Sequence, residues 1–138
     1  NKISILHCVS QYPTRPENVN LLTIKWLQQH YGQYTIGYSD HTIGISTPVA
    51  AAAMGARIIE KHITLDRRMK GTDQAGSLGP DGINRMMRDL RVLEMSFGKE
   101  EIFIEPGVES ARLKLERSIA TRRDIKAGET ITEQDVHM

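Results

Sequence analysis

Two histidines with polar neighbours are the side chains of this sequence best suited to chemistry. His41 follows Ser39 by two positions, and His62 follows Glu60 by two positions. A pattern of imidazole and oxygen donors without a thiolate fits Mn, Co, Fe or Zn, and donor softness does not choose among these ions. Such an ion would polarise a carbonyl oxygen as a Lewis acid. We therefore expect His41 and His62 to bind one divalent cation together.

Both histidines come near the ends of segments with strand composition, residues 34–39 and residues 56–64. The carboxyl ends of parallel strands share one rim, and neighbouring strands lie about 4.8 Å apart, so the two rings could reach one ion. Alternation puts Ser39 on the face of the first histidine and Glu60 on the face of the second. A single strand-end histidine is more often a hydrogen-bonded structural residue, so the prediction depends on the pair.

Three further residues are candidates for binding a substrate. Ser10 and Tyr12 follow the first expected strand, residues 2–9, and therefore lie on the same rim. Asp73 lies in a later loop, where a carboxylate could accept hydrogen bonds from sugar hydroxyls or form a turn of its own. His7 and its neighbour face opposite ways along a strand and should not form a joint site. We expect His30 and His137 on the surface.

Strands and helices alternate through the first hundred residues. Strands are expected at residues 2–9, 34–39, 56–64 and 75–78. The first helix is expected at residues 20–31. The second would be capped by Thr47, with Pro48 at its first position, and end at Gly55. The third would run from Pro80 to Phe97 and stop at Gly98. This order indicates an α/β fold with parallel strands, either an open doubly wound sheet or a closed (β/α)8 barrel. A whole barrel needs about 250 residues, so residues 2–98 could supply about half of one.

The sequence changes character after Gly98. Residues 99–117 are rich in charge and contain Pro106-Gly107, which predicts a linker without a continuous helix. Residues 118–138 contain short β-prone pieces around a turn, and Thr132 is a plausible helix cap. Because a segment below about 40 residues rarely holds a core alone, we expect it to be the beginning of a second module.

The composition of the chain excludes several classes of protein. It has 138 residues, 39% hydrophobic and 25% charged, and its 18 Lys and Arg nearly balance 17 Asp and Glu for a net charge of +1. This net charge is far from that of a typical nucleic-acid-binding protein. No stretch of the sequence is apolar enough to resemble a membrane span. The glycines match no phosphate-binding fingerprint, so no nucleotide site is indicated. One cysteine predicts a reducing, cytoplasmic location. Since the chain begins at Asn1 without a leader, we expect it to belong to a longer protein.

Several segments carry specific motifs in a fixed order. They read HCVSQYP with PENVNL (residues 7–13 and 16–21), IGYSDHT (36–42) and IEKHITLD (59–66). In order and spacing these motifs resemble the sialic acid (N-acetylneuraminate) synthase family. SIA with DIKAGETIT (118–120 and 124–132) is similar to the opening of that family's C-terminal antifreeze-like (SAF) domain. The resemblance covers nearly the whole chain.

The resemblance implies an architecture and a reaction. Residues 1–98 would form the C-terminal half of a TIM-type (β/α)8 barrel, residues 99–117 a linker, and residues 118–138 the start of the SAF domain. Enzymes of this family condense phosphoenolpyruvate with N-acetylmannosamine or its 6-phosphate, which gives a nine-carbon 2-keto acid and phosphate. The implied cofactor is a divalent metal, Mn foremost, with Mg, Co, Fe or Zn as alternatives. The implied assembly is a homodimer of the full-length protein.

The resemblance also assigns roles to individual residues. His41 and His62 resemble the two metal ligands, and Glu60 resembles a catalytic carboxylate near the metal. The expected substrate-binding residues divide into phosphoenolpyruvate contacts, Ser10 and Ser39, and sugar contacts, Tyr12 and Asp73. The family's phosphate-binding lysines have no counterpart in the sequence.

Departures from the family pattern leave the substrate open. Gln74 and Gly79 stand where family members often carry His and Glu, Gly76 stands where Ala is common, and some relatives have Asn in place of Ser10. Relatives that make legionaminic or pseudaminic acid share the histidines. Two other functions also stay open: a truncated product that binds metal or sugar without turnover, and a metal-dependent hydrolase.

Overall fold

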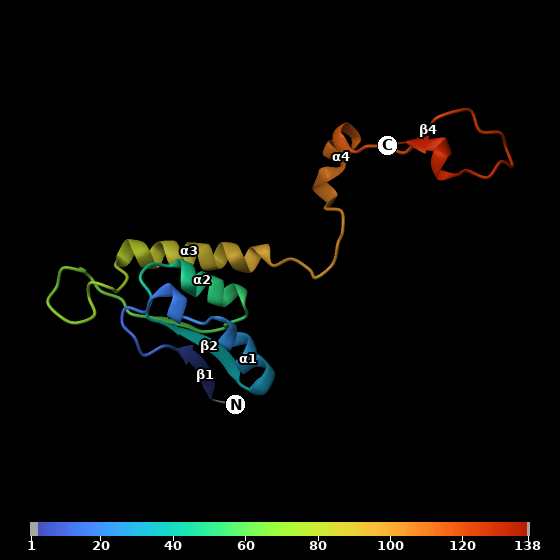
Figure 1. Cartoon of the computed structure of the whole chain (residues 1–138). Helices are drawn as coiled ribbons and strands as arrows, with labels where there is room; N and C mark the ends of the chain where they lie inside the picture. Colours follow the sequence, from blue (N-terminus) through green and yellow to red (C-terminus); the bar gives the residue numbers. More distant parts are fainter. Residues whose placement is uncertain (1–2, 138) are drawn as a thin grey trace. The chain divides into compact units, whose positions relative to one another are not determined.

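The computed structural model describes residues 3–137 and divides after Gly98 into two compact units, each described by itself (Figure 1). The first unit alternates strands and helices in the order β1 (Ser4–Cys8), a 3-10 turn (Pro16–Asn18), α1 (Leu22–His30), β2 (Thr35–Asp40), α2 (Ser46–Ala53), β3 (Ile59–Lys61) and α3 (Pro80–Ser96). The predicted α/β fold with parallel strands is confirmed.

The three strands form one parallel sheet in the order β1-β2-β3. In its register Cys8 lies beside Ser39, Ser39 beside Glu60, and Asp40 beside Lys61. Residues paired across a sheet point their side chains to the same face, and successive residues point to opposite faces. The register therefore brings the residues before the two histidines together in matched pairs.

The core lies on the side of β2 that the helices cover. Alternate residues of β2 are almost fully buried, with Ile36 4% exposed, Tyr38 2% and Asp40 0%. Ile36 and Tyr38 pack with Ile24 of α1 and Ala51 of α2, both 0% exposed. Helices α1 and α2 both contact β2, and α2 lies beside α3 (Figure 1). The opposite face of β2 is thus left for Ser39 and for His41, which follows the strand.

Some elements differ from the prediction. The strand expected over residues 56–64 is regular only at β3, and the one expected over residues 75–78 is a single parallel bridge between Ile63 and Leu78. The Leu78 amide donates to the His62 carbonyl, whereas the Ser77 amide bonds back within its own loop, so only one residue aligns with the sheet.

Two predictions about α2 and α3 have different outcomes. Helix α2 begins at Ser46 with Ile45 at its cap position, so Thr47 is not the cap and Pro48 lies two residues after the start. The predicted helix after Gly79 is confirmed by α3, which begins at Pro80.

Among the residues described, the structure has no helix with the length and apolar character required to cross a membrane.

The second unit consists of short elements: a 3-10 turn (Pro106–Val108), α4 (Glu109–Leu115), β4 (Ala120–Thr121), η3 (Glu133–Asp135) and β5 (Val136–His137). Residues 99–117 contain no continuous helix, as predicted, but Pro106 starts a turn that leads into the short helix α4, which the sequence did not predict. The predicted cap at Thr132 is confirmed, since it forms a capping box with Asp135 at the start of η3. Strands β4 and β5 pair antiparallel.

Candidate functional site

The two histidines lie together beyond the carboxyl ends of β2 and β3. Their ring centroids are 5.2 Å apart and the ring planes are nearly perpendicular, at 78°. They are twenty-one positions apart in the sequence and are brought back to one rim because β2 and β3 are parallel neighbours. His41 and His62 are therefore placed side by side, and their binding of a metal stays a prediction.

Each of the two rings has its Nδ1 near an oxygen atom of the chain. His41 Nδ1 lies 2.8 Å from the Val9 carbonyl oxygen, which can only accept, so Nδ1 donates and, in the neutral ring, Nε2 has the lone pair. His62 Nδ1 lies 3.6 Å from Asp73 Oδ2. A backbone carbonyl and a carboxylate are the groups that commonly orient metal-binding histidines through their second nitrogen. Within residues 3–137, no group of three or more His, Cys, Asp and Glu side chains could hold an ion.

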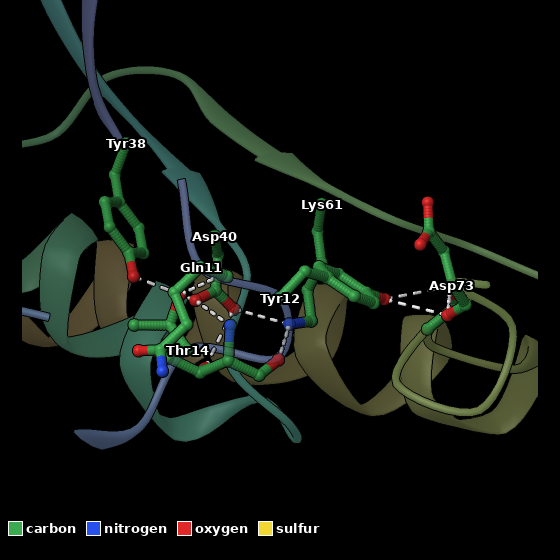
Figure 2. A network of polar contacts seen from close by, with 9 residues as sticks. Gln11, Tyr12, Thr14, Tyr38, Asp40, Lys61 and Asp73 are labelled. Atoms are coloured by element: carbon green, nitrogen blue, oxygen red, sulfur yellow. Dashed lines mark hydrogen bonds and ion pairs between the residues drawn. The ribbon is translucent and has the colours of Figure 1, made fainter. Parts of the chain in front are cut away.

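Tyr12 packs against both histidines. Its ring stacks on the His62 ring at 4.5 Å and 26°, and it meets the His41 ring edge-on at 5.5 Å. Its hydroxyl donates to the Asp73 carbonyl oxygen at 2.9 Å and lies 3.2 Å from Ser77 Oγ (Figure 2). Tyr12 was predicted as a sugar contact. In the structure its hydroxyl holds the loop after residue 72 and its ring packs against the imidazoles.

Ser39 and Glu60 form a pair on the face of the sheet that leads to the histidines. Ser39 Oγ donates to Glu60 Oε1 at 2.5 Å, and the Ser39 residue is only 6% exposed. The hydroxyl predicted beneath one histidine and the carboxylate predicted beneath the other meet because the register pairs Ser39 with Glu60. The hydroxyl proton is thus directed to Glu60, while the hydroxyl oxygen can still accept a hydrogen bond.

The remaining candidates lie around this centre. The Asp73 and His62 side chains are partly exposed, at 49% and 37%, so both are open to a ligand. Ser10 is exposed at the end of the first strand segment. Cys8 is not expected to form a site with His7, and in the structure its Sγ lies 3.9 Å from His41 Nε2. The β1–β2 register causes this approach, because Cys8 pairs with Ser39 and so shares its face.

His7 turns away from this centre, as expected. Its Nε2 bonds to the Val19 carbonyl oxygen at 2.7 Å, and its ring packs on Tyr38 at 5.7 Å. His30 and His137 are both exposed, and His30 stacks on Trp26 at 4.2 Å. The histidines that take part in the site are thus the two that follow β2 and β3.

The chain has relatives among known proteins. A model of the NeuB family matches residues 1–102. The chain belongs to the NeuB family. It is 39% identical to N-acetylneuraminate-9-phosphate synthase of Mus musculus over 92% of the chain and 35% of that protein. It is 36% identical to N,N'-diacetyllegionaminic acid synthase of Legionella pneumophila over 96% of the chain and 37% of that protein.

A solved structure has a similar fold. The N-acetylneuraminic acid synthetase of Leptospira borgpetersenii, in complex with citrate, superposes with a TM-score of 0.69 and 35% identity over 83% of this chain and 41% of that one. The chain thus spans about two fifths of the length of the proteins it matches.

One group of this NeuB chain was missed by sequence reasoning. Asp40 and Lys61, which directly precede the two histidines, form an ion pair whose side chains are 0% and 3% exposed. Tyr38 donates to the same carboxylate, and burial together with the nearby Asp40 raises the pKa of Tyr38 (Figure 2). Both residues stand in the motifs quoted above, but charge in a sequence normally predicts exposure, so nothing in the pattern indicated burial.

Proposed function

We propose that the protein is a synthase that condenses phosphoenolpyruvate with an N-acylated amino sugar, N-acetylmannosamine or its 6-phosphate. A carbon–carbon bond forms between the methylene carbon of phosphoenolpyruvate and the sugar aldehyde carbon. Water adds at the adjacent carbon that carries the phosphate group, and phosphate leaves from that carbon as the 2-keto group forms. The product is a nine-carbon 2-keto acid. The observation that carries this proposal is the approach of the His41 and His62 rings to 5.2 Å at the carboxyl ends of parallel strands, where α/β enzymes place their active sites.

The two imidazoles suit a divalent metal, Mn foremost, with Mg, Co, Fe or Zn as alternatives. The Nδ1 proton of His41 is engaged by a backbone carbonyl, which leaves Nε2 as the donor, and a carboxylate lies beside His62 Nδ1. His41 and His62 would therefore hold the ion, with water or substrate oxygens as its other ligands. When bound, the metal supplies Lewis-acid polarisation of the sugar carbonyl.

Other side chains near the histidines have proposed roles in the reaction. Glu60, held by the hydrogen bond from Ser39, presents negative charge that stabilises the positive charge developing as water adds. Asp73 is half-exposed beside His62 and can accept hydrogen bonds from sugar hydroxyls. Tyr12 stacks on His62 and limits the orientations of that ring. Ser10 and Ser39 are the proposed contacts of phosphoenolpyruvate, and Ser39 would turn its hydroxyl proton from Glu60 to that anion, which offers only acceptors.

We place this chemistry in a larger architecture. Residues 1–98 are proposed as the C-terminal half of a (β/α)8 barrel, which the parallel order β1-β2-β3 supports. Residues 118–138 are proposed as the start of an SAF domain, after a connecting segment at residues 99–117. The protein in its full natural length would act as a homodimer in the cytoplasm.

Two alternatives concern the substrate and the turnover. Legionaminic and pseudaminic acid synthases would use the same histidines on a different acylamino sugar, and the similarity to the Legionella enzyme favours including their substrates in any assay. A protein that binds metal or sugar without turnover would keep the histidine pair but release no phosphate.

The test is phosphate release by the protein in its full natural length. Phosphoenolpyruvate and each acylamino sugar are supplied together and separately, with Mn²⁺ or with a chelator. We expect release only when both substrates and metal are present, and its loss in His41→Ala and in His62→Ala. Replacement of the exposed His30 by Ala is the matched control and should leave the rate unchanged. Equal activity in the two site variants and the wild type would refute the role of the pair, and phosphate-free turnover would favour a hydrolase.

A further inference from the structure

Both side chains of the Asp40–Lys61 ion pair form several hydrogen bonds. Lys61 Nζ donates to Asp40 Oδ2 at 2.5 Å and to the Thr42 carbonyl oxygen at 2.6 Å. Asp40 Oδ1 accepts from the Tyr38 hydroxyl at 2.8 Å and from the Thr42 amide at 3.0 Å, and Oδ2 also accepts from the Thr42 hydroxyl at 3.2 Å (Figure 2). The carboxylate thus receives four hydrogen bonds.

These bonds fix the backbone on both sides of His41. Asp40 precedes it, and Thr42, which follows it, is held through its amide, its hydroxyl and its carbonyl. The His41 carbonyl accepts from the Thr14 amide at 2.8 Å. Lys61 precedes His62 and reaches across the sheet to the same network. One ion pair therefore joins the two histidine-bearing strand ends from the face opposite the site.

Stability alone gives a weak reason for this pair. Removing two charges from water is costly, and well-packed apolar residues of similar volume often replace a buried ion pair with no loss of stability. Buried charged groups are better attested as devices that select one arrangement of the chain. Here the ion pair would select one arrangement of the two strand ends that carry His41 and His62. The ring centroids of these histidines lie 5.2 Å apart.

We infer that Asp40 and Lys61 are positioning residues, which hold the backbones of His41 and His62 so that both imidazoles face one ligand. The pair itself is buried and does not touch the substrate. This inference rests on the proposed function for its metal-binding consequence, but its structural content concerns the orientation of the rings alone. It predicts that loss of the pair loosens the histidines even where the fold survives.

The test replaces both charges together, because removal of one would leave the other buried and unpaired. The double variant Asp40→Leu with Lys61→Met is made in the protein of full natural length. We expect cooperative urea unfolding near the wild-type midpoint, and a Mn²⁺ dissociation constant raised at least tenfold, since loss of groups that orient metal ligands typically weakens metal binding 10–100-fold. Free Mn²⁺ is measured from its electron paramagnetic resonance signal.

The matched control removes an exposed ion pair of the same kind. Arg91 and Glu94 on α3 lie 2.7 Å apart with side chains 64% and 60% exposed, so Arg91→Met with Glu94→Leu should leave Mn²⁺ affinity unchanged. Wild-type Mn²⁺ affinity in the folded Asp40–Lys61 double variant would overturn the inference. If that variant does not fold, Thr42→Val replaces it: a threefold or larger loss of affinity is expected, and no change contradicts the inference.

A second readout needs no metal. In imidazole ¹⁵N spectra of the metal-free wild type, His41 should show a single Nδ1–H form, as its bond to the Val9 carbonyl requires. The double variant should show a mixture of the two forms, and an unchanged spectrum would refute the inference. Should the wild type release no phosphate from phosphoenolpyruvate, the proposed function fails, while these spectra still decide whether the pair positions His41.

Discussion

Replacement of Lys61 by Met should be one of the most destabilising single substitutions in this chain. Met has a similar length and fills the space of the lysine stem, so the change removes the ammonium group with little loss of packing. It leaves the Asp40 carboxylate, which is 0% exposed, without its cation. It also removes the bond from Nζ to the Thr42 carbonyl.

The expected loss in the free energy of unfolding is about 3–5 kcal/mol, the usual result of breaking a buried ion pair on one side. Because whole domains are stable by only about 5–15 kcal/mol, the folded population should fall measurably. The assay is urea unfolding at pH 7 followed by circular dichroism, with the slope of the transition compared between variants. The exposed Lys25 on α1 provides the control, and Lys25→Met should change stability by less than about 0.5 kcal/mol.

Addition of Asp40→Leu to the Lys61→Met background should recover most of the loss, because the unpaired charge is then gone. A loss below about 1 kcal/mol in the single variant, with an unchanged slope, would refute the reasoning. It would mean that Asp40 finds another cation or water when Lys61 is absent. A failure of the second substitution to recover stability would show that packing, and not charge, is what the pair supplies.

Three further predictions concern other parts of the chain. Gly37→Ala in β2 should cost about 1–3 kcal/mol by urea unfolding, because the new Cβ would lie 2.7 Å from the Ile58 carbonyl oxygen; a neutral effect would contradict this contact. Tyr12→Phe keeps the ring but removes the hydroxyl bonds, so stability should fall by about 1 kcal/mol and amide exchange in the loop it holds should accelerate; unchanged exchange would exclude that tether. Hydrogen bonds from the amide and hydroxyl of Thr132, together with Arg123, hold the pKa of Asp135 below its ordinary value of 3.8. The turn at η3 should therefore persist above pH 3.8 and loosen as the pH falls through the lowered pKa. A carboxyl ¹³C titration of Asp135 with a pKa at or above 3.8 would disprove this.

The order of elements could be predicted from the sequence because its signals are local. Apolar spacing and a proline start placed α1 and α3 to within two residues, and strand composition located β1 and β2. Where a segment's structure depends on a distant partner, prediction was weaker. A strand was predicted at residues 75–78 from their place before the helix at Pro80, yet only Leu78 meets the sheet because the hydrogen bonds of the preceding loop are made internally.

The candidate site divides in the same way. That each histidine follows a strand segment could be predicted from sequence, since strand composition and side-chain alternation are properties of short segments, whereas the pairing of those strands as parallel neighbours is a property of the folded sheet. Only the tertiary structure decided which atoms meet across twenty or more positions: Ser39 with Glu60, Tyr12 with His62, and Asp40 with Lys61. Burial of a charged pair is a property of the packed molecule, because it depends on helices that cover one face of the sheet and on a register set by the strands.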